Sequence, residues 1–337
     1  MMRVAVMGSG SWGTAFGMVM ADAGCDVSLW GRDAEVIDEI NVSHENPRYH
    51  PGISLPRRLW GSTDAEEVLS GAEVVVLALP SYTLRDNLTR WRSFLAEGTV
   101  LVSLVKGIEL GSMMRMSQVI ALVAGVPDSR VVVVSGPNLA REIASRQPAA
   151  TTVACLDSAA ARRLQDACTT DYFRPYWTTD VVGTEVGGSV KNVVALANGM
   201  AVGMGFGENT QASLITRGLA EMTRLGVALG ANQDTFVGLA GIGDLVATCS
   251  SPLSRNRTFG VNLGKGLPLD RVVEMTSQTC EGVRSCGPIL ELAHAHGVDM
   301  PITEQVVAVV HHGQKPGDVL AALMARATRA EEGYVPN

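Results

Sequence analysis

The sequence predicts an α/β protein in which an N-terminal doubly wound sheet is followed by an all-α C-terminal domain. Three observations predict this fold. Apolar strands alternate with helical stretches in the first half, a glycine-rich turn follows the first strand, and the strand pattern stops near Gly183. The length of 337 residues suits two domains, which we place at 1–182 and 183–337.

The first β-α-β unit contains a glycine-rich turn. It consists of a β-branched strand (3–7), the turn GSGSWG (8–13), a helix (14–23) and a second strand (27–30). In this setting G-x-G-x-x-G predicts a Rossmann-type dinucleotide site. Gly8 allows the tight turn, Gly10 lets the backbone approach a pyrophosphate, and Gly13 packs the helix on the strand.

The end of the second strand bears on the choice of cofactor. Arg32 stands where it could pair with a ribose 2′-phosphate, and Asp33 is one place late for the acid that binds a 2′-hydroxyl. The alternative is a solvated Arg–Asp pair in a loop. We expect NADPH, and Asp33 leaves NADH open.

The alternation continues to the end of the first domain. Strands are predicted at 74–79, 100–105, 131–135, 151–154 and 173–178, and helices at 64–69, 82–96, 112–124 and 158–168. Ligands of such sheets bind at the carboxyl ends of the strands, and these ends are rich in glycine, proline and polar residues. Lys106 ends one strand. It either lies in solvent or binds a negatively charged or carbonyl-bearing substrate.

Lys191 is the only cation in the apolar stretch 184–207 of the second domain. A lysine that opens such a helix would be partly desolvated, which brings its amine toward proton exchange at neutral pH. The alternative is a lysine that extends along the helix end to reach solvent. Helices are predicted at 185–204, 209–229, 269–275, 288–296, 303–311 and 318–329.

A polar segment separates these helices. Asp244 follows GIG (241–243), and Ser254-Arg-Asn-Arg257 can open a helix whose hydroxyl, guanidinium, amide and free N–H groups suit a phosphate. The alternatives are a helix N-cap for Asp244 and a solvated surface for the arginines.

Composition excludes several classes of protein. The net charge of −7 argues against nonspecific nucleic-acid binding. Six cysteines show no metal-ligand spacing, so we expect reduced thiols and no metal. Residues 1–24 are apolar like a signal peptide, but glycines interrupt them. The uncharged run 192–207 is too short to span a bilayer. The chain therefore reads as cytoplasmic and not membrane-spanning.

Several motifs occur in a fixed order along nearly the whole chain. They are GSGSWGTA (8–15), WGR (30–32), NPRY (46–49) with PG (51–52), KGIE (106–109), SGP (135–137), VKNV (190–193), GIGDL (241–245), SRN (254–256) and EGV (281–283). Together they resemble the NAD(P)-dependent glycerol-3-phosphate dehydrogenases of bacteria. The resemblance implies reversible hydride transfer between NAD(P)H and dihydroxyacetone phosphate, giving sn-glycerol 3-phosphate for phospholipid synthesis.

The resemblance also implies residue roles. Lys191 would be the catalytic proton donor and acceptor. The substrate contacts would be Lys106, Gly136, Asn138, Lys191, Asp244, Ser254, Arg255 and Asn256. Beside the three turn glycines, the dinucleotide contacts would be Ser11, Trp12, Arg32, Tyr49, Lys106, Ala140, Arg255, Cys280 and Glu281. The chain departs from the family pattern at Asp33, at Asn138, where serine or threonine is common, and at 284–286.

Two rival functions stay open at this point. A β-hydroxyacid or sugar-nucleotide dehydrogenase can share the same plan of domains, with a lysine at the domain junction. A catalytically silent NADPH-binding regulatory protein would keep the turn glycines and Arg32, but it would not need Lys106, Lys191, Asp244 and Arg255 together. The sequence does not specify the oligomeric state, and a homodimer is one option.

Overall fold

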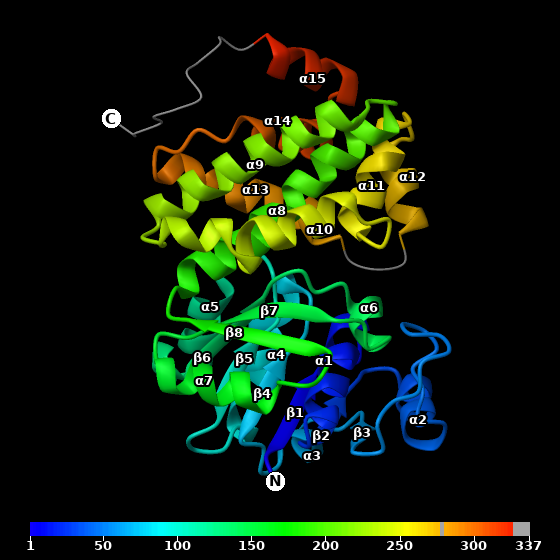
Figure 1. The fold of residues 1–337 in the computed structure, drawn as a ribbon, viewed down its shortest axis with the longest axis vertical. Helices are drawn as coiled ribbons and strands as arrows, with labels where there is room; N and C mark the ends of the chain where they lie inside the picture. The colour runs from blue at the N-terminus through cyan, green and yellow to red at the C-terminus, as the bar shows by residue number, and fades with distance from the viewer. Residues whose placement is uncertain (277–279, 326–337) are drawn as a thin grey trace.

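The computed structural model describes residues 1–276 and 280–325, and it has a sheet half and a helical half stacked on each other (Figure 1). The sheet has eight strands in the order β3-β2-β1-β4-β5-β6-β7-β8. All neighbouring strands are parallel except β6 and β7. The strands are β1 (Arg3–Met7), β2 (Asp26–Trp30), β3 (Leu59–Ser62), β4 (Val74–Leu77), β5 (Val100–Ser103), β6 (Val131–Ser135), β7 (Ala149–Ala154) and β8 (Phe173–Thr178).

Helices cover both faces of the sheet. They are α1 (Ser11–Asp22), α2 (Ala34–Val42), α3 (Ala65–Leu69), α4 (Leu84–Trp91), α5 (Met116–Ala124), α6 (Ala140–Ala144) and α7 (Ser158–Ala167). Strand β1 shows the consequence. Val4 and Val6 belong to one buried cluster, and Ala5 and Met7 belong to another. Burial on both faces explains why the sequence shows an apolar run here and no alternation. The predicted doubly wound sheet is confirmed.

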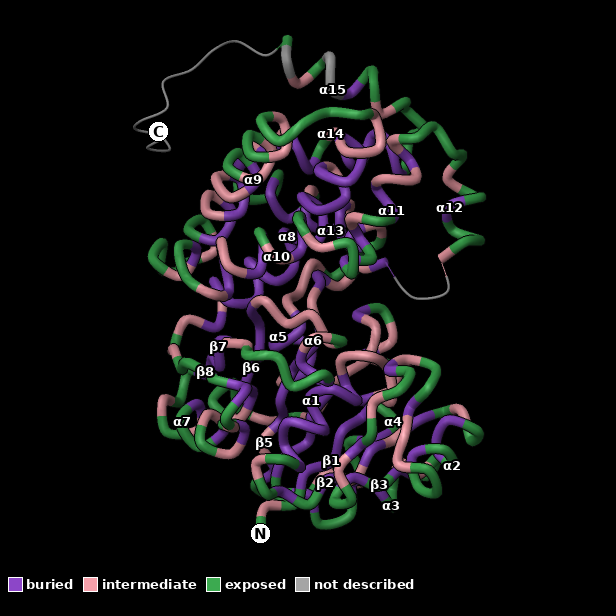
Figure 2. Tube along the Cα trace, turned by 45° about the vertical axis from the view of Figure 1, so that its right-hand side comes forward, coloured by how far each residue is buried: buried purple, intermediate pink, exposed green. Residues whose placement is uncertain are grey.

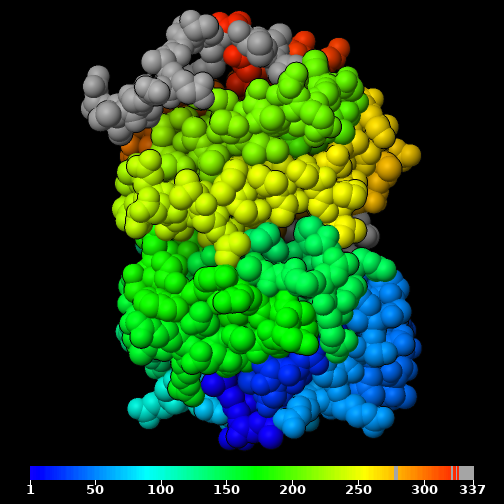
Figure 3. All heavy atoms as spheres, viewed as in Figure 1, coloured from blue at the N-terminus to red at the C-terminus, as the bar shows by residue number. Residues whose placement is uncertain are grey.

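The helical half is built around α8 (Val181–Gly203), which is buried along nearly its whole length (Figure 2). Around it lie α9 (Glu208–Ala228), α10 (Asp244–Ser250), α11 (Arg255–Gly264), α12 (Leu269–Met275), α13 (Glu281–Ala295), α14 (Pro301–His312) and α15 (Pro316–Met324). The predicted all-α domain is confirmed. The space-filling view shows yellow atoms of the helical half lying directly on green atoms of the sheet half (Figure 3).

Some predicted boundaries are wrong. Helix α8 begins at Val181, four residues early, because the Asp180 carboxylate accepts a hydrogen bond from Gly183 N at 2.9 Å. Helix α13 begins at Glu281, and Pro288 lies inside it. Elements β3, α2, α6 and α10 were not predicted. The end of the predicted helix 318–329 lies outside the described residues.

Helices α8 and α11 pack backbone against backbone. A Cβ at Gly199 would lie 2.2 Å from Arg257 O, and one at Gly260 would lie 2.2 Å from Leu196 O. One turn further on, Gly203 and Gly264 approach each other in the same way. Small residues spaced by four thus let the two helix axes come close. This contact sets the position of the N-terminus of α11.

We expect Gly199→Ala to lower the free energy of unfolding by about 2 kcal/mol, because its new methyl group meets a carbonyl that cannot move alone. Urea unfolding measures the effect. Gly287→Ala is the matched control, since its Cβ would come no closer than 3.9 Å to His311 Nε2. Gly287 lies inside α13, where alanine has the higher helix propensity, so Gly287→Ala should be neutral or should stabilise the protein by up to about 1 kcal/mol. Equal losses in both variants would contradict the packing argument.

Candidate functional site

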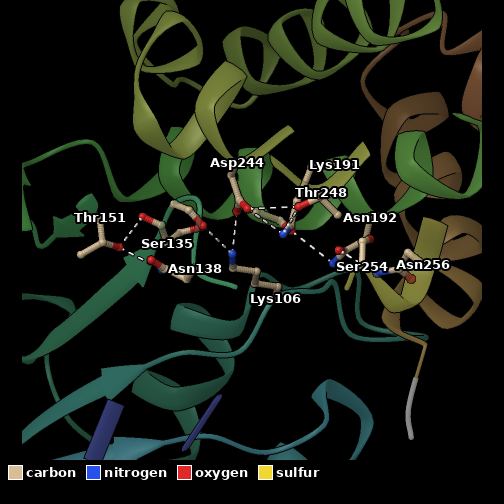
Figure 4. Close-up of polar contacts among 12 residues, drawn as sticks. Lys106, Ser135, Asn138, Thr151, Lys191, Asn192, Asp244, Thr248, Ser254 and Asn256 are labelled. Carbon is tan, nitrogen blue, oxygen red and sulfur yellow. Dashed lines mark hydrogen bonds and ion pairs between the residues drawn. The ribbon is translucent and has the colours of Figure 1, made fainter. Parts of the chain in front are cut away.

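The two halves meet at a carboxylate held between two lysines (Figure 4). Lys106 follows β5, Lys191 lies near the middle of α8, and Asp244 opens α10. Lys106 Nζ donates to Asp244 Oδ2 at 2.6 Å, and Lys191 Nζ donates to Asp244 Oδ1 at 2.7 Å. These contacts exclude a solvent-facing Lys106 and a Lys191 that reaches out from a helix end. Asp244 uses its carboxylate on the lysines, so the N-cap alternative is wrong as well.

Burial and charge together set the protonation of this cluster. Asp244 is 1% exposed. Burial opposes its ionisation, but the adjacent ammonium groups of Lys106 and Lys191 outweigh burial and lower its pKa. Burial lowers the pKa of Lys106 to about 8, against the opposing charge of Asp244. One carboxylate between two ammonium groups leaves a positive local charge, which suits an anionic substrate in a chain of net charge −7.

Two glycines explain how Asp244 reaches Lys191. Asp244 follows a π-helical turn, Leu239–Gly243, in which Gly241 has φ −101° and ψ −105°. A Cβ at Gly241 would lie 2.1 Å from Phe236 O, and one at Gly187 on α8 would lie 2.2 Å from Ala240 O. Only glycine fits at either position. The turn therefore lies against α8 one turn before Lys191.

Thr248 is part of the site, although the sequence did not point to it. Its Oγ1 accepts a hydrogen bond from Lys191 Nζ at 2.7 Å. Thr248 is buried on α10, four residues after Asp244, so the two side chains share one face of that helix. A prediction of α10 would have revealed this spacing.

The substrate residues predicted near β6 gather around one carbonyl. Gly136 O accepts from Lys106 Nζ at 3.3 Å and from Asn138 N at 2.7 Å. Asn138 Nδ2 donates to Thr151 Oγ1 at 2.9 Å, and this hydroxyl donates in turn to Ser135 O. The end of β6 is therefore tied to Lys106 on one side and to β7 on the other.

At the N-terminus of α11, several of the polar groups that we predicted to bind a phosphate form hydrogen bonds within the protein. Ser254 Oγ accepts from Arg257 N at 3.3 Å as the N-cap, which confirms the predicted start of this helix. Asn256 Nδ2 donates to Asn192 Oδ1, and Asn256 Oδ1 accepts from Gly282 N, both at 2.9 Å. The Asn256 amide thus links α8, α11 and α13. Arg255 is exposed at the same helix end.

Two predicted cofactor residues lie at the start of α13. The Glu281 carboxylate accepts from Ser81 Oγ at 2.6 Å and from Ser81 N at 3.2 Å, so it bridges the two halves, and burial raises its pKa. The Cys280 thiol donates to Asn256 Oδ1 at 2.9 Å, and burial raises its pKa to about 12. A thiol in this state is not a nucleophile at neutral pH.

The glycine-rich turn has the geometry that its sequence predicts. Gly8 has φ +139°, and a Cβ there would lie 2.3 Å from Ala78 O. A Cβ at Gly13 would lie 2.0 Å from Gly8 O, whereas one at Gly10 meets nothing within 4 Å. Among the described residues, no side chain caps the N-terminus of α1. The turn therefore leaves an open face at Gly10.

The residues that follow β2 do not form the Arg–Asp pair that was the alternative to a cofactor contact by Arg32. Arg32 is exposed at the end of β2. Asp33 caps α2 by accepting from Glu35 N at 3.1 Å, and its other oxygen pairs with Arg48 and not with Arg32. Tyr49 is half-buried, with the Arg48 guanidinium 5.8 Å from its ring centroid. Ala140 begins α6.

The described residues contain neither a metal-binding cluster nor a membrane-spanning helix. Within residues 1–276 and 280–325, no group of three or more His, Cys, Asp or Glu side chains could hold a metal ion. All six cysteines are free and buried. None of the helices in the described part of the chain is long and apolar enough to cross a membrane.

Both halves of the chain match models of one protein family. The model of the NAD-dependent glycerol-3-phosphate dehydrogenase N-terminus matches residues 3–161, and that of the C-terminus matches residues 180–321. The chain belongs to the NAD-dependent glycerol-3-phosphate dehydrogenase family. It is therefore an oxidoreductase, as its motifs implied.

Individual relatives agree with this family assignment. The glycerol-3-phosphate dehydrogenase [NAD(P)+] of Streptomyces coelicolor is 62% identical over 98% of both chains. That of Thermobifida fusca is 60% identical over 98% of this chain and 99% of its own. The crystal structure of the Coxiella burnetii glycerol-3-phosphate dehydrogenase is 36% identical, with a TM-score of 0.91 over 96% of this chain and 99% of that one.

A more distant structure shares the fold alone. D-mandelate dehydrogenase is 15% identical with a TM-score of 0.60, over 95% of this chain and 99% of that one. An enzyme with a different substrate in its name therefore shares the plan of domains. The fold alone therefore does not specify the function, whereas the family models do separate this chain from that enzyme.

Proposed function

We propose that this protein catalyses reversible, NAD(P)-dependent interconversion of dihydroxyacetone phosphate and sn-glycerol 3-phosphate. The observation that carries the proposal is the Lys106–Asp244–Lys191 cluster, which lies where the ends of the parallel strands face α8. Membership of the family supports the proposal. A regulatory protein that only bound NADPH would have no use for two lysines, one buried and one half-buried, around one buried carboxylate.

In this mechanism, Lys191 is the general acid. The dinucleotide, when bound, supplies the hydride that the substrate carbonyl carbon receives. Lys191 stabilises the negative charge that develops on the carbonyl oxygen and then donates its proton. Asp244 holds the Lys191 ammonium in place and balances its charge, with Thr248 fixing its direction. In the reverse reaction Lys191 accepts the proton.

Contacts remote from the reacting carbon position the substrate. Lys106 supplies a positive charge beside Gly136 and Asn138, and we propose that these three bind the substrate together with Asp244. Ser254, Arg255 and Asn256 form the proposed phosphate end of the site, with exposed Arg255 as its charged member. Binding energy at the phosphate then orients the carbonyl toward Lys191.

We also propose a division of labour and a biological setting. Residues 1–182 would bind the dinucleotide through Gly8, Gly10, Ser11, Trp12, Gly13, Arg32, Tyr49 and Ala140, whereas 183–337 would complete the substrate site and add Arg255, Cys280 and Glu281. The product would feed phospholipid synthesis in the cytoplasm. A homodimer is our proposed assembly, and analytical ultracentrifugation tests it.

The direct test follows nicotinamide absorbance with dihydroxyacetone phosphate and each cofactor in turn. We expect oxidation of NADPH at saturating substrate. Activity with a hydroxy-carboxylate and none with dihydroxyacetone phosphate would instead favour the β-hydroxyacid dehydrogenases. NADPH binding without oxidation across many keto-phosphates would favour the regulatory protein.

We propose that NADPH is preferred over NADH. Asp33 pairs with Arg48, so the exposed guanidinium of Arg32 makes no ion pair with Asp33 and can bind a ribose 2′-phosphate. Arg32→Ala should raise the KM for NADPH about tenfold, or ~1.4 kcal/mol, and leave the KM for NADH within about twofold. Arg57→Ala is the control, because it also removes one positive charge from an exposed position of the sheet half. It should change neither the KM for NADPH nor the KM for NADH. Equal effects of Arg32→Ala on both cofactors would contradict a 2′-phosphate contact.

A further inference from the structure

Two buried side chains hold the glycine-rich turn from behind. Asn46 Nδ2 donates to Ser9 O at 3.1 Å and to Thr14 Oγ1 at 2.9 Å. His50 Nε2 lies 2.7 Å from Ser11 O. Asn46 and His50 are each 0% exposed. Within residues 46–52 only Tyr49 was predicted to contact the cofactor, and the proposed mechanism assigns no role to Asn46 or His50.

Local backbone structure places both side chains on one side of their segment. His50 N donates to Asn46 O at 2.8 Å, which closes one turn. Residues four apart on such a turn lie next to each other. The segment therefore presents Asn46 and His50 as a pair to the loop between β1 and α1.

Hydrogen-bonding chemistry fixes the form of both groups. A carbonyl oxygen can only accept, so the His50 nitrogen beside Ser11 O carries a proton, and the Asn46 atom beside Ser9 O is its amide nitrogen. Burial lowers the pKa of His50 and the nearby charge of Arg141 lowers it further, whereas the hydrogen bond to Ser11 O raises it; the net shift is downward and favours the neutral ring. In the described chain, His50 Nδ1 is buried without a hydrogen-bond partner. His50 thus acts as a single fixed N–H donor.

Fixing a carbonyl also fixes the N–H of the same peptide. A trans peptide is planar, and its N–H points opposite to its C=O. When Asn46 holds Ser9 O, the Gly10 N–H is directed away from Asn46. When His50 holds Ser11 O, the Trp12 N–H is directed away from His50. These N–H groups belong to the uncapped N-terminus of α1, beside the open space at Gly10.

We propose that His50 and Asn46 are positioning residues that aim the Gly10 and Trp12 peptides at the dinucleotide pyrophosphate. The inference rests on the dinucleotide of the proposed function but not on its substrate. An aimed N–H pair binds a pyrophosphate without the cost of ordering the loop. If Asn46 and His50 were only part of the core, replacing them would lower the stability of the protein. It would not weaken binding of the pyrophosphate more than binding of the rest of the dinucleotide.

The test measures binding without dihydroxyacetone phosphate, using NADPH and adenosine 2′-monophosphate, which lacks the pyrophosphate. His50→Leu should weaken NADPH binding about tenfold or more and leave adenosine 2′-monophosphate within about twofold. His50→Gln retains an N–H donor and should recover NADPH affinity to within about threefold of the parent.

Asn41→Leu is the matched control. Asn41 holds both backbone groups of Gly61 in the same lobe, at 2.7 and 2.8 Å, but does not touch the turn. It should lower the melting temperature without changing NADPH affinity. If His50→Leu does not fold, Asn46→Ala carries the same comparison of the two ligands.

Three results would overturn the proposal: unchanged NADPH affinity in a folded His50→Leu or Asn46→Ala, parallel loss of both ligands, or no NADPH binding by the parent protein. NADPH binding with the expected pattern, but no turnover of dihydroxyacetone phosphate, would leave this inference intact and defeat only the proposed function.

Discussion

Lys191→Met is expected to lower kcat for dihydroxyacetone phosphate reduction by about 10³-fold, or ~4 kcal/mol of transition-state stabilisation. Methionine keeps the unbranched stem and removes the ammonium group, so the oxygen of the reacting carbonyl loses both its charge partner and its proton source. Asp244 keeps Lys106 as a partner, which limits the loss of stability. Steady-state kinetics give kcat, and NADPH fluorescence titration should show affinity within about twofold of the parent.

Lys265→Met is the control for the loss of a charge in the helical half, because Lys265 is exposed at the end of α11. It should leave kcat unchanged. If Lys191→Met retains a rate within about tenfold of the parent, worth ~1.4 kcal/mol, Lys191 is not the acid.

Asp244→Asn should lower both stability and activity. The amide can accept from one lysine only, and its NH₂ group faces the other ammonium, so a buried positive charge is left unpaired. Breaking such a buried pair costs about 3 kcal/mol of unfolding free energy, and we expect a loss of about 10²-fold in kcat/KM. Chemical denaturation and steady-state kinetics measure the two effects.

The pH profile gives a second measurement of the same substitution. Asp244 raises the pKa of Lys106 against burial, and the pKa stands at about 8. Lys106 is therefore charged below about pH 8 and loses its charge above it. In Asp244→Asn the charge of Asp244 is gone, so substrate binding should weaken at a lower pH than in the parent. An unchanged profile would contradict this account.

The double variant Lys106→Met/Asp244→Asn separates charge from packing. It removes the unpaired ammonium group, so it should recover part of the stability that Asp244→Asn loses. A double variant that is less stable than Asp244→Asn would show that packing of the Lys106 stem decides the effect.

Much of the fold could be predicted from local sequence patterns. Where the prediction was wrong, the cause lies in the local sequence of the element. Strands β1, β4, β5 and β6 are buried on both faces and are therefore apolar runs. Such a run can be recognised in the local sequence without knowing which segments pack against it. Strand β3 is a four-residue edge strand with only partial burial, so it carries no such run. Helix α13 continues through Pro288, where the sequence suggested a start.

The site divides in the same way. The turn at 8–13, Lys106 at a strand end and Lys191 in an apolar helix were visible in the sequence, because each depends on residues within a few positions of it. The contacts of Thr248, Asn46 and His50 were not visible, because the partners of these side chains come from other elements.

Tertiary structure alone brought Asp244 to the two lysines, which lie 138 and 53 positions away in the chain. The approach depends on glycines that let a turn lie against α8, and spacing along the chain does not encode it. Local pattern could therefore name the charged groups and the cofactor turn. It could not say that a single buried carboxylate holds both lysines, because that depends on how the two halves pack.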